Sequence, residues 1–184
     1  MVYPIYVCGS PVLRQVTKDI ADRSLVTPEL IADMFETMYL SNGVGLAAPQ
    51  IGKSLRFFVI DATPRAEEEP ALAEFKRVFI NPHIEQWSDE EVNAEEGCLS
   101  IPGIHEMVWR PKRIRLRYFD EYWVEHDEEF DGNAARIIQH EYDHLEGKIF
   151  TDRISPLRKA LLRGKLAAMT RGKYSADYKT KLIK

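Results

Sequence analysis

The stretch His140-Glu141-Tyr142-Asp143-His144 organises this 184-residue chain, because it places two histidines four residues apart with a carboxylate between them. On an α-helix, residues i and i+4 lie one above the other, about 6 Å apart along the axis. Both imidazoles can therefore bind one metal ion. Glu141 lies on the same face, displaced by one residue, and can accept a proton from water at the metal without binding the metal itself. The stretch predicts a helix that supplies half of a catalytic metal site.

The third protein ligand must come from elsewhere, because a catalytic site normally has three and leaves one position open to water. The motif continues as His140-x-x-x-His144-x-x-Gly147-x-x-Phe150, which follows the metzincin pattern until Phe150 stands where a third histidine belongs. No glutamate follows Gly147, although the other large class of zinc peptidases takes one from downstream. Upstream, Cys98 follows a glycine that lets the backbone approach closely. We therefore predict Cys98 as the third ligand.

Three separated blocks of the sequence resemble the peptide deformylases, which remove the formyl group from the N-terminal methionine of new bacterial polypeptides. The blocks are Gly43-Val44-Gly45-Leu46-Ala47-Ala48-Pro49-Gln50-Ile51-Gly52, Glu96-Gly97-Cys98-Leu99-Ser100 and Gln139-His140-Glu141-Tyr142-Asp143-His144-Leu145-Glu146-Gly147. H-E-x-x-H alone recurs by chance, whereas all three blocks in this order and spacing are a strong signal. The resemblance runs from about Pro11 to about Phe150, and it weakens in an acidic insert near residues 62–74 and in the tail.

The resemblance implies a metal-dependent hydrolase that releases formate and a free N-terminus. A divalent ion on the three predicted ligands would lower the pKa of its water from about 15.7 toward 7. Glu141 would take the proton and later deliver it to the departing amine. Negative charge on the formyl oxygen would be met by the side-chain amide of Gln50 and the backbone N–H of Leu99, and one such donor is typically worth about 3 kcal/mol.

The metal is left open by the ligand set, because a thiolate is a soft donor that tolerates Fe(II), Co(II), Ni(II) or Zn(II). The resemblance implies Fe(II) in the cell, often replaced by zinc during isolation. We therefore expect one divalent ion, with iron as the native metal.

The expected substrate is an N-formylmethionyl nascent peptide bound as an added strand, for which the glycines of the first block leave the backbone unobstructed. In the resembled family, the carbonyl at the Gly45 position meets the substrate backbone. Val44 and Ile137 are the residues expected to support a preference for methionine.

Two other positions bear on the site. Asn133 stands where many family members have an aliphatic residue that lines the methionine pocket, which predicts a more polar or reshaped pocket. Arg110 is expected to pair with Glu96 or Asp143 and so to support the metal ligands, the alternative being a solvated surface arginine.

The pattern along the chain indicates an α+β fold, a single domain of antiparallel or mixed strands packed around the central metal-binding helix, with a C-terminal helix. A first helix is expected to start at Thr27-Pro28 and to stop at Asn42-Gly43. Asp131 and Gly147 are the expected cap and stop of the metal-binding helix. Residues 62–75 are expected to form an exposed loop. Strands are predicted at 55–60, 78–87, around 92–94, 114–119 and 122–126.

Composition agrees with one soluble domain over residues 1–184, with 45% hydrophobic residues. No apolar run approaches the roughly 20 residues needed to cross a bilayer, and the start lacks a basic region followed by a long apolar one. We expect a cytoplasmic protein with neither membrane nor DNA as a partner. Two cysteines, Cys8 and Cys98, are too few and too far apart in the sequence to indicate a disulfide-stabilised fold. A reducing compartment would leave Cys98 free to bind a metal as a thiolate.

The C-terminal segment 158–184 is strongly basic. It has nine lysines and arginines against one aspartate, a net charge of +8, whereas the whole chain carries −4 and the remainder therefore −12. A basic tail on an acidic body favours docking to a polyanion. The resemblance makes the ribosome the expected partner, although a solvated helix with a frayed end would explain the charge equally well.

Two other classes of function stay open from the sequence. A zinc endopeptidase or amidase of other specificity would share the two histidines and Glu141, but it needs neither Gln50 nor Cys98. A non-catalytic, metal-binding, ribosome-associated module would keep the tail and show no turnover, and the intact Glu141 argues against it.

Overall fold

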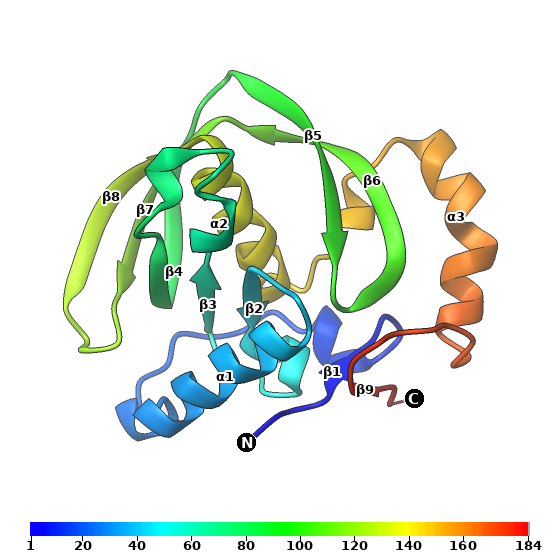
Figure 1. Cartoon of the computed structure of the whole chain (residues 1–184), viewed down its shortest axis with the longest axis horizontal. Coiled ribbons are helices and arrows are strands. Elements are labelled where there is room, and N and C mark those ends of the chain that lie inside the picture. The colour runs from blue at the N-terminus through cyan, green and yellow to red at the C-terminus, as the bar shows by residue number, and fades with distance from the viewer. Residues whose placement is uncertain (184) are drawn as a thin grey trace.

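Helix α2 (Gly132–Leu145) lies at the centre of the fold, between a five-stranded sheet and a long two-stranded hairpin (Figure 1). The structure is a computed structural model that describes residues 1–183. The predicted α+β class, with strands packed around this helix, is confirmed.

The five-stranded sheet has the order β2-β3-β4-β7-β8, and every neighbouring pair is antiparallel. Its strands are β2 (Gly45–Ala47), β3 (Phe57–Asp61), β4 (Lys76–Trp87), β7 (Arg113–Phe119) and β8 (Glu125–Asp131). Apolar side chains on one face of this sheet pack against α2 and form a continuous core. The sheet therefore holds α2 along its length and fixes where the two histidines lie.

The strand predicted at 122–126 starts later than expected. The Asp120 carboxylate accepts the backbone N–H groups of Tyr122 (2.9 Å) and Val124 (3.0 Å), which closes a turn before β8 begins at Glu125. Trp123 has a φ of 60°, in the left-handed region that is common in turns and interrupts regular strand geometry.

The two-stranded hairpin consists of β5 (Glu91–Cys98) and β6 (Ile101–Pro111). The sequence predicted only the part of β5 around residues 92–94 and missed β6. Inward and outward side chains do alternate along β6, but two of the inward positions hold Glu106 and Arg110. These charged residues hide the apolar alternation by which a strand is recognised.

Helices α1 (Pro28–Leu40) and α2 begin where the capping residues predict. The hydroxyl of Thr27 accepts the N–H of Leu30 at 3.1 Å, and Asp131 caps the N-terminus of α2. Gly147 follows α2 with a φ of 67°, and a Cβ there would lie 2.6 Å from a backbone oxygen of Arg14. Only glycine is compatible with both conditions, so the chain leaves the helix at this point.

The expectation of an exposed loop at residues 62–75 is only partly correct. The segment forms two short 3-10 helices, η4 (Thr63–Arg65) and η5 (Pro70–Leu72). Leu72 and Phe75 are buried in the core, and the Phe75 ring packs edge-on against Phe130. The insert is therefore anchored over the end of α2.

The C-terminal segment starts with helix α3 (Pro156–Met169) and then returns to the body of the protein. Strand β9 (Thr180–Lys181) pairs in parallel with β1 (Ile5–Tyr6), and Figure 1 shows the two side by side. Because residues 180 and 181 are paired in this way, the alternative of a frayed end does not hold for this part of the segment. The last residue of the predicted basic tail, Lys184, lies outside the described residues. Among residues 1–183, no helix is both long and apolar enough to span a membrane.

Candidate metal centre and active site

The structure brings together the three predicted metal ligands, Cys98, His140 and His144. Their ligand atoms lie within 4.8 Å of one another. The end of β5 supplies the sulfur, and successive turns of α2 supply the imidazoles. The Cys98 Sγ lies 3.4 Å from the Nε2 of His144. A tetrahedral ion with metal–sulfur and metal–nitrogen bonds of about 2.3 and 2.0 Å separates these two atoms by about 3.5 Å, so the site fits a zinc-sized divalent ion.

The hydrogen bond of His140 and the buried oxygen of Glu141 also fit a metal site. His140 Nδ1 lies 2.8 Å from Glu96 Oε1, and a proton on Nδ1 leaves Nε2 with the lone pair that binds a metal. Nδ1 of His144 and Oε2 of Glu141 are both buried and have no hydrogen-bond partner among the described residues. A buried carboxylate oxygen without a partner is costly, and here it lies beside the three ligands, where water at the metal would satisfy it.

Arg110 is buried behind the ligands and pairs with both carboxylates that the sequence suggested. It donates to Glu96 at 2.6 and 2.9 Å and to Asp143 at 2.9 Å. Arg136 donates to Glu96 at 2.6 Å, and Arg153 makes two hydrogen bonds of 2.6 Å to Asp143. The alternative of a solvated arginine is wrong. The network fixes the side chain that orients His140.

The electrostatics of the site favour a thiolate and a carboxylate of intermediate basicity. Burial raises the pKa of Cys98, but the charges and hydrogen bonds of His144 and His140 outweigh it and lower the pKa to about 5. Burial raises the pKa of Glu141 to about 6, although both histidines oppose the shift. A group with that pKa can both accept and donate a proton near neutrality.

Gln50 lies in η3 (Ala48–Ile51), buried next to the sulfur. Its Oε1 accepts the backbone N–H of Ala47 at 2.9 Å, so that Nε2 faces the site, 3.5 Å from Cys98 Sγ and 3.2 Å from Ser100 Oγ. Leu99 occupies the turn between β5 and β6 and lines the same cavity. The two predicted oxyanion donors therefore border one space.

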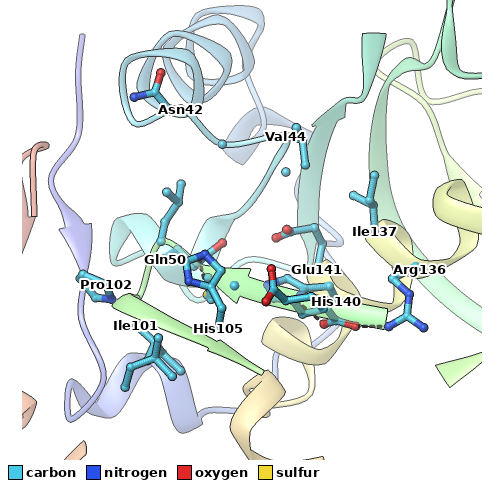
Figure 2. Close-up of a pocket in the computed structure, with 18 of the residues that line it drawn as sticks. Asn42, Val44, Gln50, Ile101, Pro102, His105, Arg136, Ile137, His140 and Glu141 are labelled. Atoms are coloured by element: carbon cyan, nitrogen blue, oxygen red, sulfur yellow. Dashed lines mark hydrogen bonds and ion pairs between the residues drawn. The ribbon is translucent and has the colours of Figure 1, made fainter. Parts of the chain in front are cut away.

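A cavity of about 510 Å³ opens at these residues, and Val44, Gly45 and Ile137 all line it. Figure 2 shows Val44 above Glu141, Ile137 to its right and His105 to its lower left. A Cβ at Gly45 would overlap the Glu141 carboxylate, so glycine is required here to make room for that group.

Asn133 does not line the cavity, so the prediction of a more polar or reshaped pocket does not rest on direct contact with this side chain. Its Nδ2 donates to Glu69 Oε2 at 2.6 Å, and the cavity lining includes Arg65 from the same insert. Sequence reasoning missed Arg65, His105 and Tyr178, because each comes from a segment outside the three motif blocks and carries no local signal.

The comparisons with known proteins agree with this geometry. The family model for polypeptide deformylase matches residues 2–160. This chain belongs to the polypeptide deformylase family. The peptide deformylase of Cytophaga hutchinsonii is 50% identical over 181 residues, covering 98% of this chain and 97% of the relative. That of Flavobacterium johnsoniae is 47% identical over 188 residues, covering 98% and 96%.

Solved deformylase structures share the fold. The peptide deformylase of Thermus thermophilus has a TM-score of 0.81 and 43% identity, covering 93% of this chain and 97% of that one. The Thermotoga maritima structure has a TM-score of 0.76 and 43% identity, covering 85% and 99%. Polypeptide deformylases are metallo-hydrolases that remove the N-formyl group from nascent peptides, and this family membership supports the deformylase interpretation over the peptidase and non-catalytic alternatives.

Proposed function

We propose that this deformylase acts on N-formylmethionyl peptides with Cys98, His140 and His144 holding one divalent ion and Glu141 moving the proton. The observation that carries the proposal is the convergence of three ligand atoms within 4.8 Å beside a buried carboxylate oxygen that has no partner among the described residues. The proposal treats residues 1–184 as one catalytic domain with a basic C-terminal tail.

Glu141 performs the proton transfers. A divalent ion held by Cys98, His140 and His144 would supply Lewis-acid chemistry, which lowers the pKa of water at the site and so eases its deprotonation at neutral pH. Glu141 removes one proton from the attacking water, whose oxygen adds to the formyl carbon. The same carboxyl group then protonates the amine as the C–N bond breaks, which leaves formate and a free N-terminus.

Gln50 and Leu99 stabilise the transition state. The Nε2 of Gln50 is aimed at the cavity by the hydrogen bond from Ala47, so no reorganisation is needed when charge develops. The backbone N–H of Leu99 is the second donor to the formyl oxygen.

The peptide lies along β2 as an added strand, with the carbonyl of Gly45 meeting its backbone and the methionine side chain between Val44 and Ile137. Both aliphatic side chains line the cavity. Comparing formyl-Met, formyl-norleucine and formyl-Ala peptides measures this preference, and equal kcat/KM values for all three would contradict it.

The central experiment is formate release from formyl-Met-Ala by protein purified anaerobically and loaded with Fe(II) or Ni(II), with Glu141→Ala beside it. We expect turnover that the substitution reduces by about 10²-fold or more. The exposed Glu91→Gln is the matched control. Cleavage of internal bonds in unformylated peptides, with no formate released, would favour the endopeptidase alternative.

Fe(II) is the proposed native metal, because the family resemblance implies it and a thiolate with two imidazoles accepts it. Metal analysis of anaerobically purified protein is expected to find iron, with activity that decays in air. Tightly held zinc alone, with full air-stable activity, would overturn the assignment.

Ribosome docking through α3 is a separate part of the proposal. The helix exposes Lys159, Arg163 and Lys165, whereas Arg158 is paired with Glu106. Reversing the three exposed charges should abolish salt-sensitive co-sedimentation with ribosomes while formate release persists. Equal co-sedimentation of this variant would contradict the docking site.

A further inference from the structure

After helix α3, the C-terminal segment folds back so that residues near its end lie at the active site. The N–H of Ile5 donates to the carbonyl of Lys179, and that of Val7 donates to the carbonyl of Lys181, both at 2.9 Å. These bonds hold β9 against β1 (Figure 1). Tyr178, directly before the paired residues, is thereby held at the cavity, which its side chain lines.

The phenol of Tyr178 makes a single directed contact with the catalytic machinery. Its hydroxyl donates to the carbonyl oxygen of Leu99 at 2.8 Å. The ring is partly buried in the apolar cluster that also receives the Leu99 side chain. Burial raises the pKa of Tyr178 to about 12, so the hydroxyl keeps its proton at neutral pH.

The Leu99–Ser100 peptide is held at both of its polar ends. Its carbonyl accepts from Tyr178, and its N–H, on Ser100, donates to Cys98 Sγ at 3.4 Å. Because a peptide unit is planar, these two bonds define the orientation of the unit. A donor at the carbonyl also polarises the peptide and strengthens the N–H as a donor to sulfur.

We propose that Tyr178 is a positioning residue for deformylation, whose hydroxyl fixes the Leu99–Ser100 peptide. This peptide holds the Ser100 N–H on the thiolate, and it anchors one side of the Leu99 backbone, which restrains the rotation that would turn the neighbouring Leu99 N–H away from the formyl oxygen. This inference rests on the proposed roles of Leu99 and Cys98. The family model matches residues 2–160, so Tyr178 lies beyond the matched segment.

Tyr178→Phe tests the inference, because it keeps the ring and removes only the hydroxyl. Tyr174→Phe is the matched control, since the Tyr174 hydroxyl lies 3.0 Å from Thr180 Oγ1 within the same segment and does not line the cavity. For formyl-Met-Ala, Tyr178→Phe should lower kcat about tenfold and change KM less than twofold. Tyr174→Phe should change neither value more than twofold.

A second readout is the sulfur-to-metal charge-transfer band of the Co(II)-substituted full chain. Loss of the Tyr178 hydroxyl weakens the Ser100 N–H···Sγ bond, so the band should shift to lower energy in Tyr178→Phe and stay in place in Tyr174→Phe. The spectrum is recorded without substrate, so it tests the connection between the Tyr178 hydroxyl and the Cys98 sulfur independently of turnover. If wild-type protein released no formate, that result would overturn the proposed function and not this connection. Urea unfolding checks that both variants fold.

An unshifted band together with kcat within twofold of wild type would overturn the role of Tyr178. Equal effects in both variants would also overturn it, because they would report a general loosening of the C-terminal segment.

Discussion

Arg110 makes a two-pronged ion pair with Glu96, donating from Nε at 2.6 Å and from a terminal nitrogen at 2.9 Å, with only 1% of the arginine exposed. Glu96 in turn orients Nδ1 of His140. Arg110 on β6 thus positions Glu96 on β5, which in turn orients the predicted metal ligand His140 on α2. Contacts among these three elements therefore fix the geometry of the site.

Arg110→Met should destabilise the protein, because it leaves Glu96 and Asp143 buried with fewer partners. Removing one partner of a buried pair typically costs 3–5 kcal/mol; since Arg136 and Arg153 remain, we expect about 3 kcal/mol. Urea unfolding measures the change. Arg115→Met is the control, because its pair with Asp127 is solvent-exposed and should contribute little. Equal effects of the two substitutions would contradict the interpretation.

Cys98→Ala should lose the metal, whereas Cys8→Ala should keep it. Cys8 is a free cysteine, partly buried against an apolar cluster. Elemental analysis after dialysis should find at least about tenfold less metal in the Cys98 variant. Losing a contact that supports a ligand typically lowers metal affinity by about 10-fold or more, and losing the ligand itself should lower it further. A chelator should likewise remove activity from wild-type protein, and added Ni(II) should restore it. Retained metal in Cys98→Ala would exclude the thiolate as a ligand.

Ile137→Ala should weaken the preference for methionine. The substitution enlarges the cavity next to Val44, so kcat/KM for formyl-Met-Ala should fall about tenfold relative to that for a formyl-Ala peptide. The ratio of the two values is insensitive to any general loss of active protein. An unchanged ratio would place the methionine side chain elsewhere.

Asp61→Asn should make stability less dependent on pH in acid. Burial raises the pKa of Asp61, but hydrogen bonds from Thr63 and Tyr39 outweigh it and hold the pKa below its ordinary value of 3.8. The carboxylate therefore stabilises the fold above about pH 4, and this contribution is lost as pH falls through the folded-state pKa. The variant should be about 1 kcal/mol less stable at pH 7, and the difference from wild type should shrink as pH falls from about 4 toward 2. Unfolding of wild type, Asp61→Asn and the exposed control Asp89→Asn across this range measures the difference.

Local signals were enough to locate the helices that carry and support the site. Thr27 and Asp131 are caps whose side chains act within a few residues along the chain, and the spacing of His140 and His144 acts within one turn of helix. The same signals failed for β6, where the inward positions hold Glu106 and Arg110. Those charges are buried only because partners from distant segments, Arg158 and Glu96 among them, neutralise them.

The sequence by itself determined the ligand types, the helix that presents two of them and the acid between them, because helical geometry places residues i and i+4 on one face wherever the helix lies. Only the tertiary structure decided that Asn133 turns to Glu69 while Arg65 enters the cavity, and that Tyr178 reaches the Leu99 carbonyl. These contacts join segments far apart in the chain. Their partners are selected by the packing of the insert and the C-terminal strand, which no local pattern of residues encodes.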